Sequence, residues 1–208
     1  MNTDGTGHRP MQKRAEATRQ ALLDAALELF SERGFHGTNT KEVAARAGVA
    51  TGSVYRYFTN KKALFLAVMS RMEDAMRGQI FGLGRELAAS GAPPRQTMER
   101  LVGFALEAHR PHRAFHREVL AMTLLDPDVA RVEAEREGRV RRELMDFLAD
   151  MPGLYPPDDL EAAAEMIHLS VEEVAHRAVI FDSPIGEERL TRMLLDMLGA
   201  WLVIENGA

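Results

Sequence analysis

Hydrophobic positions along this chain recur at intervals of three and four residues, which is the period of an α-helix. Runs that alternate apolar and polar residues, as half-buried strands do, are almost absent. A clear helix is predicted over about residues 12–33, where Leu22, Ala26 and Leu29 share one face and Gly34 marks the end. The pattern as a whole predicts an all-α protein.

Two short helices, at about 41–47 and 51–57, are predicted on either side of Gly48. Asn39 or Thr40 is suited to cap the first of them, because both side chains can accept hydrogen bonds from helix N–H groups. Glycine adopts the positive φ of a tight turn without strain. Two short helices joined in this way form a helix-turn-helix, which presents its second helix to a DNA major groove.

Glycine and proline interrupt the helical pattern over residues 75–94, and we place the domain boundary there. The prediction is a disordered tail of residues 1–11, a helix-turn-helix domain of residues 12–75 and a helical-bundle domain of residues 76–208. The helices of the last domain are predicted at about 95–109, 112–125, 127–150, 158–182 and 187–204.

The composition is that of a globular protein, with 46% hydrophobic and 27% charged residues among 208. The absence of cysteine excludes disulfides and thiolate chemistry. No apolar run reaches the roughly 18 residues that span a bilayer, and the first ten residues lack the apolar segment of a signal peptide. We therefore expect a cytoplasmic protein without membrane contact.

The net charge of −5 conceals an asymmetry along the chain. Residues 1–77 contain 12 Lys and Arg against 8 Asp and Glu, whereas residues 78–208 contain 14 against 23. A basic first part and an acidic second part are typical of a DNA-binding domain joined to a domain with another task.

The helix predicted over 51–57 has the chemistry of a recognition helix. It begins with Thr51, Gly52 and Ser53, whose small size lets a helix approach base edges closely. Its last part offers two phenol hydroxyls and a guanidinium to phosphate oxygens. These groups belong to Tyr55, Arg56 and Tyr57. Thr40, Lys41 and Lys61 lie near predicted helix N-termini, where a phosphate is favoured.

The segment AGVATGSVYRYFTNKKAL, which begins at Ala47, resembles the DNA-binding domain of the TetR family of transcriptional regulators. That family shows an Ala-Gly-Val turn, small residues, Tyr-x-aromatic-Phe and then Lys-x-x-Leu. The resemblance covers roughly residues 12–70, and Asn39 departs from it at a position where threonine is frequent. It implies base contacts from the small residues at 51–53. The implied phosphate-binding residues are Thr40, Lys41, Tyr55, Arg56, Tyr57 and Lys61, and Asn39 is expected among the DNA-binding residues as well.

One such helix reads only a few base pairs, so specific binding favours a two-fold homodimer on a palindromic operator. In the family, the last two long helices of each subunit form the dimer interface. The residues expected there are Val171, Val174, Ala178, Leu190, Leu194, Leu198 and Trp201.

The resemblance also implies a repressor that is released from double-stranded DNA by a small-molecule effector held in the helical bundle. Apolar walls and polar contacts for an unidentified effector are expected from residues of four helices and a loop. They are Phe104, His112, Phe115, His116, Phe147, Met151, His168 and Glu172. The charged face that includes Arg136 is interpreted as a solvated surface.

Two alternatives stay open. The first is a metal-binding helical bundle, similar to a di-metal oxidase, that uses the His and Glu residues of the helices predicted at 112–125 and 158–182. His112 and His116 lie on the former helix, and Glu165, His168, Glu172 and His176 share one face of the latter. Glu165-x-x-His168 and Glu173-x-x-His176 match the Glu-x-x-His motif that is typical of di-metal bundles. Both such motifs lie on one predicted helix, however, so we predict no metal and no cofactor. A second alternative is a body without ligand that acts through protein partners. No Ser-His-Asp set, phosphate loop or HExxH motif is present, and we predict that the protein is not an enzyme.

Overall fold

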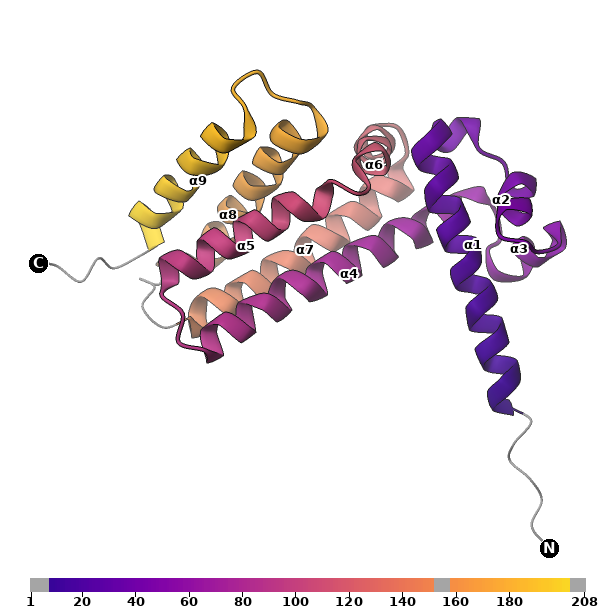
Figure 1. Ribbon diagram of the computed structural model, residues 1–208, viewed down its shortest axis with the longest axis horizontal. Helices are drawn as coiled ribbons and strands as arrows, with labels where there is room; N and C mark the ends of the chain where they lie inside the picture. The colour runs from indigo at the N-terminus through magenta and orange to yellow at the C-terminus, as the bar shows by residue number, and fades with distance from the viewer. Residues whose placement is uncertain (1–7, 152–157, 203–208) are drawn as a thin grey trace, which may run out of the picture. The chain divides into compact units, whose positions relative to one another are not determined.

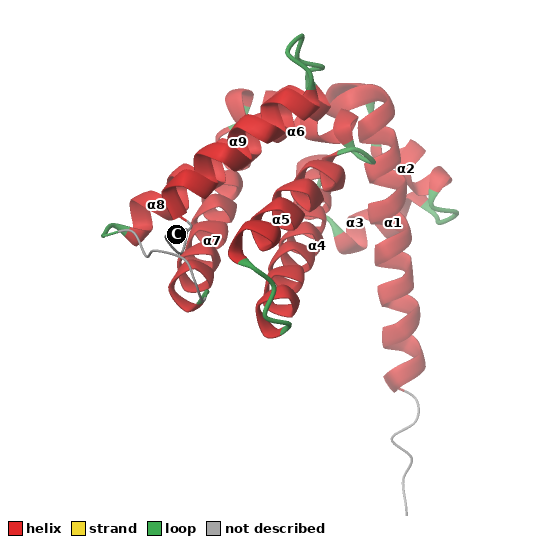
Figure 2. Cartoon of the chain, turned by 60° about the vertical axis from the view of Figure 1, so that its left-hand side comes forward, coloured by secondary structure: helices red, strands yellow, loops and turns green. Residues whose placement is uncertain are grey.

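The computed structural model describes residues 8–151 and 158–202, and every regular element in those ranges is a helix (Figures 1 and 2). This confirms the predicted all-α fold. The chain divides into two compact units, Met1–Met72 and Glu73–Ala208, and the division falls within helix α4 (Lys61–Ala89). None of the helices in the described ranges combines the length and apolar content that crossing a bilayer requires.

The first unit contains α1 (His8–Gly37), α2 (Thr40–Arg46), α3 (Thr51–Tyr57) and the first part of α4. Helix α1 begins four residues before the predicted start, and residues 1–7 of the predicted tail lie outside the described residues. Gly34 interrupts α1 with a φ of 70°, as its predicted place at the helix end requires.

An aromatic core holds the first unit together. The rings of Phe30 and Phe65 meet edge to face with centroids 5.2 Å apart, and Phe35 lies 5.4 Å from Phe65. Val43 on α2 and Val54 on α3 are completely buried in the same unit. Because Val54 is the buried residue of α3, the rest of that short helix is left partly or fully exposed.

The second unit contains the remainder of α4 and five further α-helices. Asp126 caps α7 by accepting from the N–H groups of Asp128 and Val129, and Pro127 follows at the first helical position, as predicted. The predicted helix 158–182 is in fact an α-helix followed by a π-helical turn. The bounds are α5 (Pro94–His109), α6 (Arg113–Leu125), α7 (Pro127–Asp150), α8 (Leu160–Ala175), η1 (His176–Ile180) and α9 (Glu187–Leu202).

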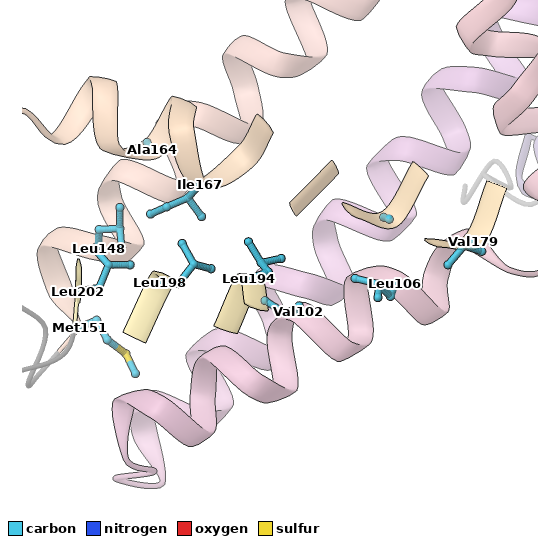
Figure 3. Close-up of a cluster of buried hydrophobic side chains, with 11 residues drawn as sticks. Val102, Leu106, Leu148, Met151, Ala164, Ile167, Val179, Leu194, Leu198 and Leu202 are labelled. Carbon is cyan, nitrogen blue, oxygen red and sulfur yellow. The ribbon is translucent and has the colours of Figure 1, made fainter. Parts of the chain in front are cut away.

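Helices α5, α8 and α9 contact one another around the main apolar cluster of this unit (Figure 3). Leu194 and Leu198 on α9 are each only 3% exposed inside it, beside Val102 of α5. The prediction that these two leucines form a dimer interface is therefore wrong. Helix α9 is apolar on two sides, and its sequence does not reveal which side faces its own subunit.

Most of the other residues predicted at the dimer interface pack against the same apolar cluster. Val171, Val174 and Ala178 are partly buried and pack against it. Leu190 is partly buried, and Trp201 remains 43% exposed. Of the predicted interface residues, only Trp201 thus presents a large apolar surface to solvent.

We expect Leu198→Ala to lower the free energy of unfolding by about 2–5 kcal/mol, because it removes a buried side chain and leaves a cavity. Met197→Ala, one residue away and 50% exposed, is the matched control and should change it by less than about 0.5 kcal/mol per subunit. Urea denaturation at a protein concentration too low for association measures both. Equal effects of the two variants would contradict the assigned orientation of α9.

Candidate functional site

The geometry of the helix-turn-helix begins with the cap of α2. The side-chain oxygen of Asn39 accepts hydrogen bonds from the N–H groups of Lys41 and Glu42, at 3.1 and 3.0 Å. Asn39 is therefore the cap, and Thr40 is free for another contact. The Thr40 hydroxyl lies 2.9 Å from the hydroxyl of Tyr55 and links α2 to α3.

The turn between α2 and α3 depends on Gly48, whose φ is 67°. The N–H of Val49 then donates to the carbonyl of Ala44 and holds the chain against the end of α2. Beyond the turn, Thr51 and Gly52 are exposed at the start of α3. A Cβ atom added to Gly52 would meet nothing within 4 Å in the part of the chain that the structure describes, so no contact there requires glycine.

The basic and phenolic groups of α3 hold one another in place. An Arg56 N–H donates to the Tyr57 hydroxyl at 3.0 Å, and the guanidinium lies 5.0 Å from the centre of the Tyr57 ring. Tyr55 is 55% exposed, with its hydroxyl at the contact with Thr40. The exposed side of α3 thus carries two phenols and a guanidinium in restricted positions.

Lys61, which was expected to bind a phosphate, has its ammonium group engaged within the protein. Its ammonium donates to the carbonyls of Phe35 and Thr38, at 2.7 and 2.8 Å, and lies 4.4 Å from the centre of the Phe35 ring. The half-buried side chain therefore ties the start of α4 to the segment before α2. Lys41, in contrast, is exposed.

We expect Lys61→Met to lower the free energy of unfolding by about 1–3 kcal/mol, because two carbonyl groups lose their donor. Lys41→Met is the control: it should leave stability unchanged and weaken DNA binding at low salt, with the salt slope reduced by about one. Denaturation and DNA titration of both variants distinguish the roles. Unchanged stability of Lys61→Met would contradict the structural role of this lysine.

The second unit encloses an apolar cavity of about 150 Å³. Its walls come from α4, α5, α7, α8 and α9, and its apolar lining includes Ile80, Phe81, Leu101, Val102 and Leu144. A cavity of this volume is large enough for one aromatic ring.

Three of the predicted effector residues, Phe147, His168 and Glu172, line this cavity. The other five do not. Phe115 is buried elsewhere, and Met151 belongs to the apolar cluster and borders an adjoining, more polar hollow. Phe104, His112 and His116 also lie outside the lining of the cavity. The spacing of residues identifies a helix face but not its distance from a cavity, which explains why these five residues lie outside the lining.

One end of the cavity is polar, and sequence reasoning missed its central residue. Arg136 is only 8% exposed, so its interpretation as part of a solvated face is wrong. Its guanidinium lies 2.5 Å from Glu133 and 3.5 Å from both Glu73 and Glu172. We call these four residues the Arg136 cluster. The signal was present in the sequence, because Arg136 falls on the inward stripe of Val129, Val132 and Val140.

The carboxylates of the Arg136 cluster differ in charge state. Burial and the neighbouring charge of Glu133 raise the pKa of Glu73 to about 9, against the attraction of Arg136. Burial would also raise the pKa of Glu172, but the nearby imidazoles of His109 and His176 and the charge of Arg136 hold it well below its ordinary value. At neutral pH, Glu73 is therefore protonated and Glu172 ionised.

Histidines surround the other oxygen of Glu172. Its Oε2 atom lies 3.2 Å from Nε2 of His176 and 3.7 Å from Nε2 of His109. His116 packs on His109 with ring centroids 4.6 Å apart. Burial, aided by the charge of His109, lowers the pKa of His116 to about 3, and burial lowers the pKa of His168. Both of these rings are neutral at pH 7.

The raised pKa of Glu73 predicts how stability depends on pH. Between about pH 4.5 and about pH 9 the folded chain holds a proton on Glu73 that the unfolded chain has released, so stability falls as the pH rises through this range. Glu73→Gln removes the group that binds this proton. We expect the variant to lose less stability than the parent between about pH 5 and about pH 9 in urea denaturation. If stability depends on pH equally in the two proteins, the pKa of Glu73 is ordinary. The attraction of Arg136 and Arg139 would then offset burial and the repulsion of Glu133.

Comparisons with known proteins agree with this architecture. Residues 22–68 match the family described as bacterial regulatory proteins, tetR family, and residues 93–202 match the tetracyclin repressor-like C-terminal domain. A crystal structure of a putative TetR-family transcriptional regulator from Mesorhizobium loti superimposes with a TM-score of 0.75, covering 92% of this chain and 99% of its own at 18% identity.

Curated relatives match over shorter segments. The HTH-type transcriptional repressor KstR2 of Rhodococcus jostii is 38% identical over 93 residues, which is 43% of this chain and 42% of the relative. The HTH-type transcriptional regulator RutR of Escherichia coli is 32% identical over 120 residues, or 56% of this chain and 53% of the relative. The chain thus spans about half the length of these relatives. Since the two family matches together extend over most of the described residues, the chain belongs to the TetR family of transcriptional regulators, which are not enzymes.

Proposed function

We propose that this protein is a transcriptional repressor that binds a palindromic operator as a homodimer and is released by a small-molecule effector. The observation that carries the proposal is the exposure of α3. Val54 anchors the helix in the core, while Thr51 and Gly52 stay exposed and Ser53 half-exposed at its start. A protein that acts in this way works on DNA in the cytoplasm.

The start of α3 is the proposed base-reading part. Thr51 and Ser53 can exchange hydrogen bonds with base edges, and Gly52 adds no bulk between them. Within residues 8–151 and 158–202, no atom fills the space beside Gly52, which supports close approach by an outside partner. The helix therefore suits insertion into a major groove.

Phosphate contacts are proposed around this helix. Tyr55 and Thr40, which share a hydrogen bond, lie on α3 and α2, so one phosphate group could meet both hydroxyls. Arg56 and Tyr57 are held against each other and offer further donors. Asn39 and Lys41 contribute from the start of α2, whereas Lys61 has its ammonium engaged by two carbonyl groups.

The proposed dimer face is on the outer side of α8 and α9. Met193, Met197 and Trp201 follow one another at intervals of four on α9 and are exposed by 68, 50 and 43%. Met166 and Leu169 on α8 are exposed by 56 and 48%. Large apolar side chains gathered on two neighbouring helices are typical of a surface that a partner covers.

The apolar cavity is the proposed effector site. Its lining favours a largely apolar molecule, and His168, Glu172 and Arg136 offer polar contacts at one end. An effector that binds the conformation with wrongly spaced recognition helices would shift the population away from operator-bound protein.

Ser53→Leu tests the role of α3. We expect specific operator binding to weaken by about 1,000-fold or more, because the leucine holds α3 away from the bases. Ala121→Leu, at an exposed position of α6, should bind as the parent does. Fluorescence anisotropy measures both, and circular dichroism confirms that they are folded. Retained specific binding by Ser53→Leu would exclude α3 from the groove.

The dimer face is tested by Met197→Asp. A charge at the centre of an apolar interface loses its hydration, so sedimentation equilibrium should show a shift from dimer towards monomer. Ala121→Asp places the same charge on an exposed position of another helix and should remain dimeric. If Met197→Asp dimerises as the parent does, the interface lies elsewhere.

A further inference from the structure

We propose that His109, Glu172 and His176 form a binding site for a divalent transition-metal ion, for which Zn²⁺ is the best-suited occupant. The three residues come from α5, α8 and the π-helical turn η1. Two imidazoles and one carboxylate are the donor set of many zinc sites. This inference concerns a site within the second unit and does not depend on the proposed DNA-binding role.

The distances among the ligand atoms fit one ion. Glu172 Oε2 lies 3.2 Å from His176 Nε2 and 3.7 Å from His109 Nε2, and all three atoms lie within 4.8 Å of one another. Around a tetrahedral zinc ion with bonds of about 2.0–2.1 Å, neighbouring ligand atoms are about 3.4 Å apart. Small side-chain movements therefore suffice to bring the three atoms into one coordination shell.

His109 carries the independent evidence for a ligand. Its side chain is only 2% exposed, and its Nε2 atom has no hydrogen-bond partner within the described part of the chain. Its Nδ1 atom lies 2.7 Å from the carbonyl of Ala105, which is a backbone contact that orients metal-binding histidines. With Nδ1–H donating to Ala105, the lone pair of Nε2 points away from that carbonyl. A buried nitrogen that faces a carboxylate without a hydrogen bond is costly, and a bound cation removes that cost.

The other two ligands are placed by the end of α8. Glu172 and His176 are one turn apart, and His176 begins the π-helical turn, which is an element frequent at functional sites. The packing of His116 on His109 limits the movement of the His109 ring. The ligands are therefore largely held in place before an ion arrives.

Arg136 and the two histidines approach different oxygen atoms of Glu172. Arg136 approaches Oε1 at 3.5 Å, whereas both histidines face Oε2. Glu133 lies 2.5 Å from Arg136 and balances its charge. The Oε2 atom of Glu172 is thus available to an ion. Because His109 and Glu172 also line the apolar cavity, that ion would lie at the cavity wall. Three protein ligands leave a fourth coordination position for water or an effector atom.

The test uses the full chain, stripped of metal with a chelator and titrated with Zn²⁺ by calorimetry. We expect one ion per chain for the parent protein and at least about 100-fold weaker binding for His176→Ala and Glu172→Gln. His36→Ala, which removes an exposed histidine of the first unit, is the matched control and should bind as the parent does. Circular dichroism establishes that each variant is folded.

A second titration, with Co²⁺, reports the ligand geometry in the parent protein and so does not depend on any variant folding. A visible absorption spectrum of a four-coordinate ion that zinc abolishes is the expected result. Absence of stoichiometric Zn²⁺ binding by the parent, or unchanged affinity in His176→Ala, would overturn the proposal. DNA binding by the metal-free protein is measured in parallel, so failure of the metal site and failure of the proposed DNA-binding function give different results.

Discussion

The buried charge of Arg136 is the constraint on which the arrangement of the second unit depends. A guanidinium that is 8% exposed must be surrounded by acceptors, and the carboxyl groups around it come from three helices, α4, α7 and α8. Glu172 extends the network to His109 on α5 and His176 on η1. One charge therefore joins most of the helices around the cavity and gives an otherwise apolar space a polar end.

This arrangement relates the proposed effector site to α4. Glu73 contributes a carboxyl group to the Arg136 cluster, and it lies on the continuous helix that begins at Lys61 (Figure 1). Lys61 in turn donates to the carbonyls of Phe35 and Thr38, close to the start of α2. A ligand that rearranges the cluster would thus act on a helix whose other end supports the helix-turn-helix. Coupling of this kind needs only a difference in affinity between two conformations.

The sequence predicted the local features well because they depend on local chemistry. Helical periodicity, the turn at Gly48 and the cap at Asp126 are each determined by a few neighbouring residues. Features that depend on packing between distant helices were not predictable in the same way. Leu194 and Leu198 belong to an apolar helix with two candidate faces, and their burial in one cluster with residues of distant helices, such as Val102, decides between them. Arg136 falls on the inward stripe of α7, but its partners Glu73 and Glu172 lie far away in the sequence, so the buried cluster itself was not predictable.

Specific DNA binding is tested most directly by a fluorescence-anisotropy titration of the unmodified protein against the DNA upstream of its own gene, with random DNA as competitor and the salt concentration varied. We expect binding that resists the competitor, with a dissociation constant of about 10⁻⁸ M or tighter and two chains per palindromic site. Binding as weak as to random DNA, at every upstream segment and every salt concentration, would contradict the central claim that α3 reads a specific operator.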